Sequence, residues 1–207
     1  MPSSLERATH WRRLVELDVR ARALATVVHL GRFEIVRDAW IYPAAAIDIS
    51  LGDVILDGAH NPQGAAALAR TLRERGIRPT LVLAVSADKD VRAIVREILP
   101  AVGDVIAVQY NQDRSMKAHE LAAIIGEASA ELGPVTWPAL HDRPSVTEPR
   151  VIATSGAMTR ALYDATKTRH PGQILIAGSL FIVGEARTLL VGAPTDPILA
   201  TDPSVRK

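Results

Sequence analysis

The residues Val54–Pro62, with the sequence VILDGAHNP, decide the fold more clearly than any other part of the chain. An apolar run leads into an acid, a glycine and Asn-Pro, an order typical of a strand, a tight turn and the start of a helix. Asn61 can accept hydrogen bonds from the first helical amides, and Pro62 suits the first helical position because it lacks an N–H that would have no partner there. Asp57 and His60 therefore come together at the carboxyl end of a strand, where open α/β sheets bind ligands.

Two interpretations of this turn stay open from its residues alone. Asp57 and His60 could form hydrogen bonds with a polar ligand such as a ribose or a phosphate. Alternatively, Asn61 and Pro62 are helix-start residues that need no ligand, and a lone histidine in a turn is ordinarily solvated or bonded to nearby backbone. The position at a strand end favours a ligand site but does not decide between the two.

The rest of the chain alternates buried strands with amphipathic helices. The strands are expected at residues 54–57, 80–85, 105–108, 151–153 and 174–177, and the helices at residues 62–75, 91–99, 118–132, 156–167 and from Gly178-Ser179 to Leu190. Apolar strands that are each followed by a helix predict an α/β fold, with a Rossmann-like, mostly parallel sheet and helices on both faces. Short strands at 33–36, 40–42 and 45–49 are expected to add an antiparallel edge hairpin.

Length and composition limit the class of protein. A chain of 207 residues with 48% hydrophobic and 4% aromatic residues suits one domain with an aliphatic core, with appendages. A net charge of +1 gives no general reason to expect binding to nucleic acid or to an anionic membrane, and the absence of cysteine excludes disulfides and thiol nucleophiles. No stretch is long and apolar enough to span a bilayer, and the amino terminus does not look like a signal peptide, so a cytoplasmic protein is expected.

Three segments are predicted along the chain. Residues 1–28 carry apolar side chains at helical spacing from Trp11 onward, which indicates an amphipathic helix followed by a linker. Residues 29–191 form the α/β domain. Residues 192–207 contain three prolines and little that could pack, so a flexible tail is expected.

Further candidate site residues follow the next strand. Asp88-Lys89-Asp90 comes after the strand that ends at Val85, on the same sheet edge as Asp57. Asp90 is expected to cap the next helix, whereas Lys89 could either orient a substrate or be solvated.

Two more candidates lie near the ends of the domain. Ser179 follows Gly178 at a strand end, where it could face a ligand or simply cap the last helix. Arg32 is a candidate phosphate contact, although an isolated arginine at a strand start is ordinarily a surface residue. Gly184, inside the last helix, is expected to be a close-packing position.

Several catalytic signatures are absent. The sequence has no Gly-Lys-Ser or Gly-Lys-Thr, no G-x-G-x-x-G and no G-x-S-x-G turn. His119 has no second histidine four residues on, and no cluster has metal-ligand spacing. The sequence therefore predicts no catalytic residue and no metal ligand within this chain.

Four segments together resemble a known family. They are GRFE at residues 31–34, DGAHNP at 57–62, DKD at 88–90 and GSLFIVGE at 178–185. In this order they resemble the carboxyl-terminal domain of folylpolyglutamate synthase / dihydrofolate synthase, which belongs to the Mur ligase superfamily. The resemblance covers the chain from Arg22 to Arg187 and implies the α/β fold of a Mur ligase C-terminal domain.

The resemblance also implies a reaction. Enzymes of this family use Mg-ATP to phosphorylate a carboxylate of a folate or of dihydropteroate, and the amine of L-glutamate then attacks the acyl phosphate. Two sets of site residues are implied: ATP contacts at Arg32, Asp57, His60 and Asn61, and substrate or cleft contacts at Asp88, Lys89 and Ser179. The stretch between Arg32 and Asp57 is longer than the family usually shows, which could displace Arg32 from its expected partner.

The family has an amino-terminal ATPase domain that this sequence does not contain. That domain carries the phosphate loop, the magnesium ligands and most of the folate site, and residues 1–28 resemble its final helix and linker. The expected ligands are ATP, Mg²⁺, folate and glutamate, and the expected partner is a P-loop ATPase domain, in cis or in trans. The isolated chain is expected to be inactive, with self-association through the Trp11 helix.

Two alternatives compete with this interpretation. The chain could be a non-catalytic nucleotide-binding or regulatory module of the same fold. It could also be a stand-alone nucleotide-binding α/β protein that is unrelated to ligation.

Overall fold

The computed structural model of the protein describes residues 31–41, 49–137, 145–147, 151–153, 158–168 and 173–192. The expected helix of residues 1–28, most of the expected strand at 45–49 and the expected tail beyond residue 192 lie outside these ranges. The elements in chain order are β1 (Glu34–Ile41), β2 (Ile49–Asp57), α2 (Pro62–Glu74), β3 (Thr80–Leu83), α3 (Val91–Ile98), the 3₁₀ helix η1 (Leu99–Ala101), β4 (Val105–Ala107), α4 (Ala118–Leu132), β5 (Val135–Trp137), β6 (Ser145–Thr147), β7 (Val151–Ala153), α5 (Met158–Ala165), β8 (Gln173–Ala177) and α6 (Leu180–Val191).

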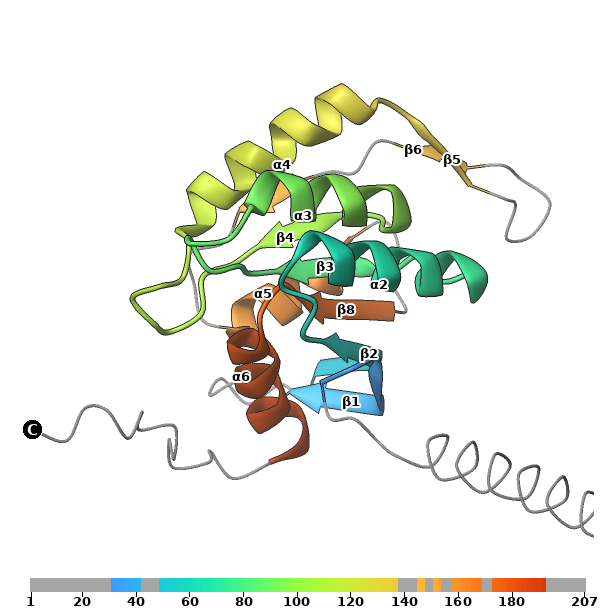
Figure 1. Ribbon diagram of the computed structural model, residues 1–207. Coiled ribbons are helices and arrows are strands. Elements are labelled where there is room, and N and C mark those ends of the chain that lie inside the picture. The colour runs from blue at the N-terminus through green and yellow to red at the C-terminus, as the bar shows by residue number, and fades with distance from the viewer. Residues whose placement is uncertain are drawn as a thin grey trace, which may run out of the picture. The chain divides into compact units, whose positions relative to one another are not determined.

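A six-stranded sheet with the order β1-β2-β8-β3-β4-β7 forms the centre of the domain (Figure 1). β1 is antiparallel to β2, and every other neighbouring pair in this sheet is parallel. β5 and β6 form a separate antiparallel pair. The predicted fold class, a mostly parallel α/β sheet with an antiparallel edge hairpin, is confirmed.

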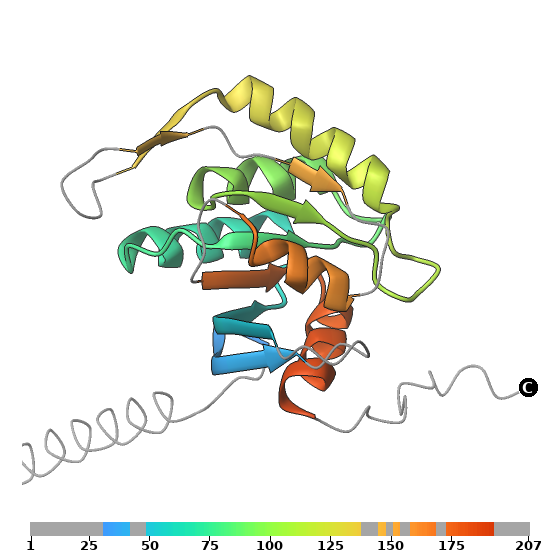
Figure 2. The same ribbon diagram turned by 180° about the vertical axis from the view of Figure 1, so that it is seen from behind.

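Helices cover both faces of the sheet, and each face has its own aliphatic core. Successive side chains of a strand point to opposite faces, so Leu81 and Leu83 of β3 pack with α2, α3 and α4, whereas Val82 between them packs with α5 and α6. Comparison of Figures 1 and 2 shows α2 and α3 in front of the sheet and α5 behind it. The strands are buried on both faces, which explains their continuous apolar sequence.

The edge hairpin differs in detail from the prediction. One strand, β1, replaces the two predicted at 33–36 and 40–42, and its pairing with β2 shifts register between Val36 and Ala39. Asp53 of β2 braces this bulge, because its Oδ1 accepts a hydrogen bond from the Asp38 N–H at 3.3 Å and its Oδ2 lies 2.9 Å from Arg37 Nη1. Pairing with β1 also starts β2 at Ile49, well before the predicted start at Val54. The first part of β2 contains Ser50, Gly52 and Asp53 and therefore lacks the continuous apolar run by which the rest of the strand was predicted.

Candidate functional site

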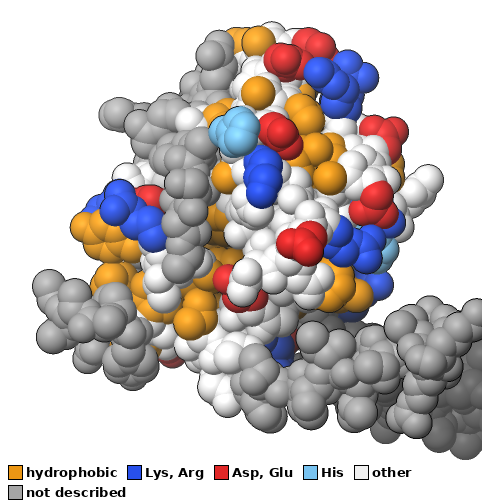
Figure 3. Space-filling model, turned by 90° about the vertical axis from the view of Figure 1, so that its left-hand side faces the viewer, with side chains coloured by type: hydrophobic (Ala, Val, Ile, Leu, Met, Phe, Trp, Pro, Cys, Tyr) orange, Lys and Arg blue, Asp and Glu red, His pale blue; other side chains and the backbone are white. Residues whose placement is uncertain are grey.

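The parallel strands β2, β8, β3 and β4 end at one edge of the sheet. Asp57, Ala177, Leu83 and Ala107 lie in register at that edge, so the loops that follow them are neighbours. Figure 3 looks at the molecule from the side toward which β3, β4 and β8 run, and shows acidic and basic side chains beside hydrophobic ones. This is the edge at which open α/β sheets bind ligands.

Asp57 ends β2 and is almost fully buried, with 9% of the residue exposed. Its Oδ1 accepts a hydrogen bond from the Ala59 N–H, and its Oδ2 accepts one from the Phe33 N–H, both at 2.8 Å. The Gly58 N–H also donates to the Gly31 carbonyl oxygen at 2.7 Å. The carboxylate therefore fixes the turn after β2 and fastens the loop 31–34 to it. The predicted contact of Asp57 with ATP stays a prediction.

Glu34 holds the same loop from the other side. Its Oε2 accepts a hydrogen bond from the Gly31 N–H at 2.8 Å, and Arg187 Nε of α6 donates to both of its carboxylate oxygens, at 2.9 and 3.1 Å. The two side chains are only 10% and 23% exposed, so this ion pair is mostly shielded from water. Sequence reasoning did not identify Glu34 and Arg187 as partners, because nothing local links residues 153 positions apart.

Arg32 is the exposed residue of this loop, and its guanidinium has no hydrogen bond or ion pair within the part of the chain that the structure describes. The described parts of the long stretch between Arg32 and Asp57 lie mostly in the paired strands β1 and β2. The predicted displacement of Arg32 from its expected partner stays a prediction, although the hydrogen bond from the Phe33 N–H to Asp57 Oδ2 brings the segments of Arg32 and Asp57 together. The two residues lie in neighbouring backbone segments.

Phe33 gives the loop an unusual backbone. Its φ is +47°, in the left-handed region that residues other than glycine seldom adopt. The half-buried ring packs on the core beneath α2, and the Arg75 guanidinium carbon lies 4.6 Å from the ring centre. The hydrogen bond to Asp57 and this packing together stabilise a strained turn next to Arg32.

His60 and Asn61 complete the turn after β2. His60 Nδ1 lies 2.8 Å from the Gly58 carbonyl oxygen, which can only accept. Nδ1 therefore donates, and Nε2 is the acceptor in the neutral ring. Asn61 Oδ1 accepts a hydrogen bond from the Gly64 N–H at 2.7 Å, which confirms the predicted helix cap. The contacts of both residues with ATP remain predictions.

The loop after β3 carries the acid–lysine–acid segment. Asp90 caps α3 as predicted, accepting a hydrogen bond from the Ala93 N–H at 3.1 Å. Asp88 pairs with the Lys89 ammonium at 3.3 Å and with Arg114 Nη2 of the next loop at 3.2 Å. Partial desolvation raises the pKa of Asp88, but the hydrogen bonds from Arg114 and Lys89 and their positive charges outweigh it and hold that pKa below its ordinary value of 3.8.

Ser179 is buried, and its Oγ accepts a hydrogen bond from the Phe181 N–H at 3.2 Å, so it caps α6. Gly178 before it has a φ of +106°, and a Cβ there would lie 2.4 Å from the Ala84 carbonyl oxygen. Only glycine fits this turn. The prediction that Gly184 is a close-packing position was wrong, because no described atom lies within 4 Å of a Cβ built there.

Two further properties concern ligands and membranes. Across the described ranges, no group of three His, Asp or Glu side chains could hold a metal ion. None of the helices described is long and apolar enough to cross a bilayer.

Most of this chain is similar in sequence to known proteins. A family model described as the C-terminal domain of dihydrofolate synthetase matches residues 45–189. A probable bifunctional folylpolyglutamate synthase/dihydropteroate synthase from Halobacterium salinarum is 34% identical over 84% of this chain and 18% of its own length. The dihydrofolate synthase/folylpolyglutamate synthase of Mycobacterium tuberculosis is 31% identical over 86% of this chain and 34% of its own length.

A solved structure shows the same similarity. The Mycobacterium tuberculosis folylpolyglutamate synthase complexed with ADP and AMPPCP has a TM-score of 0.56 and 28% identity to this chain, and the match covers 80% of this chain and 33% of that one. The chain spans 34% or less of the length of these relatives.

The Glu34–Arg187 pair predicts a stability difference. Glu34→Gln is expected to lower the free energy of unfolding by about 2–3 kcal/mol, because it leaves a mostly buried guanidinium without its counter-charge. The matched control is Glu131→Gln, which breaks an ion pair to Arg96 whose side chains are 56% and 61% exposed. That change is expected to cost at most about 1 kcal/mol in urea denaturation. Equal losses of unfolding free energy in the two variants would show that the Glu34–Arg187 ion pair contributes no more than an exposed pair does.

The Asp88 pair predicts a pH effect. Arg114→Met is expected to raise the pKa of Asp88 toward its ordinary value, as followed by ¹³C NMR of the carboxyl group. Because the pKa is lowered in the folded protein, the pair stabilises the fold above the ordinary pKa, and that contribution is lost as the pH falls through the folded value. Arg92→Met, which removes the partner of Glu127, is the control and should leave Asp88 unchanged. An Asp88 that titrates identically in both variants would refute the pairing.

Proposed function

The chain belongs to the family of dihydrofolate synthetase C-terminal domains, and on that premise we propose that it forms one wall of the nucleotide cleft of an ATP-dependent ligase. The ligase would join L-glutamate to a folate or to dihydropteroate through an acyl phosphate. The opposite wall, with the phosphate loop and the magnesium ligands, would come from a P-loop ATPase domain in cis or in trans. The isolated chain is expected not to catalyse the ligation, because closure of two domains would assemble the site.

One observation carries this proposal: Arg32 is exposed on a loop that is fastened from both sides. Asp57 accepts the Phe33 N–H, and Glu34 accepts the Gly31 N–H while paired with Arg187. Because the backbone on both sides of Arg32 is held, only its side chain has to be ordered to meet a phosphate, where the guanidinium can neutralise charge that develops. In this proposal, Asp57 acts chiefly by positioning Arg32.

His60 and Asn61 would supply the remaining polar groups of this wall. His60 Nδ1 is bonded to the Gly58 carbonyl oxygen, so Nε2 is the ring atom available to a ribose or phosphate group. The Asn61 side-chain oxygen caps α2, which leaves its NH₂ group to donate. Both assignments rest on the family and on these orientations.

A second candidate is a non-catalytic module of the same fold. It is favoured by the finding that oxygens of Asp57, Asn61 and Ser179 already accept backbone hydrogen bonds. Such a module would keep these residues for folding alone, and its ligand contacts would change no reaction rate.

Arg32 distinguishes the two candidates. We expect Arg32→Met to lower kcat/KM for ATP by about tenfold or more in an assembly of this chain with a P-loop ATPase domain, since a charged hydrogen bond to phosphate is lost. The assay follows glutamate-dependent phosphate release. The matched control is Arg37→Met, which removes an exposed arginine from β1. Equal rates for the two variants would reject the ligase proposal and favour the module.

A further inference from the structure

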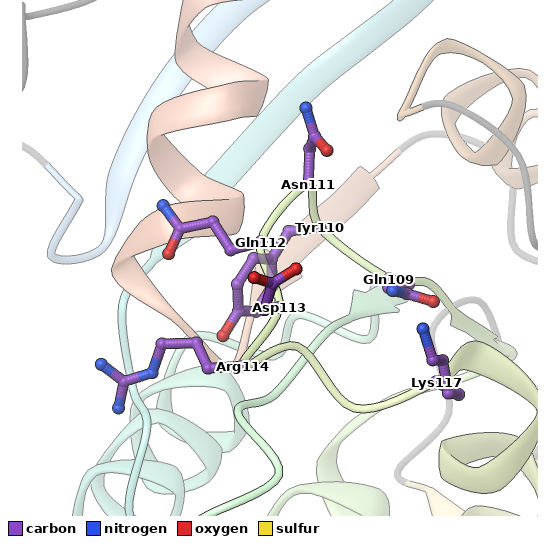
Figure 4. A pocket seen from close by; sticks show the side chains of 7 residues that line it. All are labelled: Gln109, Tyr110, Asn111, Gln112, Asp113, Arg114 and Lys117. Carbon is purple, nitrogen blue, oxygen red and sulfur yellow. The ribbon is translucent and has the colours of Figure 1, made fainter.

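The loop that joins β4 to α4 is built around a buried aromatic residue. Residues 109–114 and Lys117 of this loop line a pocket (Figure 4). Tyr110 is only 2% exposed, although its neighbours in the loop are polar. In Figure 4 its side chain runs back from the loop toward the side on which Arg114 lies, whereas Asn111 points the opposite way. The contacts of Tyr110 show what its burial achieves.

Tyr110 contacts the loop after β3 and the start of α6 at the same time. Its hydroxyl oxygen lies 2.7 Å from Ser86 Oγ, which is also buried. Its ring is stacked on that of Phe181, with the ring centres 5.6 Å apart and the planes inclined by 25°. Within its own loop, the Tyr110 N–H donates to Ser115 Oγ at 3.1 Å. One residue therefore joins three segments that are far apart in the sequence.

A second set of contacts leads from Phe181 back to the turn after β3. The Arg114 guanidinium carbon lies 5.9 Å from the centre of the Phe181 ring, and Arg114 Nη2 lies 3.2 Å from Asp88 Oδ2. Asp88 also pairs with the Lys89 ammonium at 3.3 Å, and the Lys89 N–H donates to the Ser86 carbonyl oxygen at 3.2 Å. The loop after β4 therefore holds the turn of Lys89 by one buried contact and by one exposed contact.

The buried contact is the stronger of these two restraints. The side chains of Asp88 and Arg114 are 53% and 50% exposed, so water screens the attraction between them. The hydroxyl groups of Ser86 and Tyr110 lie in the interior, where their hydrogen bond cannot be exchanged for one to water unless the loop opens. The position of the turn at residues 86–89 therefore depends more on Tyr110 than on the ion pair.

We propose that Tyr110 is a positioning residue for the ligation, which fixes Lys89 at the sheet edge without touching a ligand itself. This inference rests on the proposed function and on the prediction that Lys89 faces the cleft. The Lys89 side chain is 36% exposed, so its ammonium is accessible at the edge. Loss of the Tyr110 hydroxyl would free the turn that carries Lys89 and would leave the ring stacked on Phe181. A group displaced by about 1 Å can slow a reaction by orders of magnitude.

The test compares Tyr110→Phe and Ser86→Ala in an assembly of this chain with a P-loop ATPase domain, with glutamate-dependent phosphate release as the assay. Each variant is expected to lower kcat by about tenfold. KM for ATP should stay unchanged, because the loop of Arg32 is held by other hydrogen bonds.

Thr80→Val is the matched control for the loss of a buried hydroxyl group. Thr80 Oγ1 lies 2.6 Å from Thr168 Oγ1, both residues are buried, and Thr80 begins β3 at the opposite end from the candidate site. The stability of this variant should fall about as much as that of Tyr110→Phe, whereas its kcat should match wild type.

A double variant tests whether Tyr110 acts through Lys89. Lys89→Met should lower kcat, and Tyr110→Phe added to it should lower kcat no further, because the turn then carries no ammonium to position. Losses that multiply in the double variant would show that Tyr110 acts elsewhere, and would overturn the assignment.

Failure of this inference can be told apart from failure of the proposed function. If the wild-type assembly does not ligate, the proposed function fails and this inference fails with it. If the wild type is active and both Tyr110→Phe and Ser86→Ala match Thr80→Val in kcat, only the positioning role is overturned. Hydrogen exchange of the full chain alone needs no partner domain: the Lys89 amide should exchange faster in Tyr110→Phe than in Thr80→Val, and equal exchange would also overturn the assignment.

Discussion

The carboxylate of Asp57 joins two backbone segments that the sequence keeps apart. One oxygen accepts the Ala59 N–H and shapes the turn after β2, and the other accepts the Phe33 N–H at the start of β1. An amide left without an acceptor would cost free energy. Because one carboxylate serves both amides, the position of each segment depends on the position of the other. Arg32, beside Phe33, lies at the sheet edge because of this connection.

Elsewhere along this edge of the sheet, side chains also accept hydrogen bonds from nearby backbone amides. Asn61, Asp90 and Ser179 cap the helices that follow β2, β3 and β8. Gly178 lets β8 turn closely beside Ala84. These contacts place the starts of three helices at one edge, where their amide ends favour anionic ligands. Fold and candidate site therefore depend on the same short turns.

The features that could be predicted from the sequence are those that depend on residues close together in the chain. Apolar strands, helix spacing and caps such as Asn61 and Asp90 need only neighbours in the chain, and they indicated the correct fold class. The pairing of Glu34 with Arg187 and of Asp88 with Arg114 could not be read in this way, since each joins distant segments. The β1 bulge and the early start of β2 were missed because pairing between strands outweighed local propensity there.

Hydrogen exchange of the backbone amides in Asp57→Ala tests the role of this carboxylate most directly. We expect the Phe33 and Ala59 amides to lose protection and the loop 31–34 to become mobile, while amides in the middle of α4 keep their wild-type protection. Unchanged protection at Phe33 in a folded variant would show that the loop is held without Asp57.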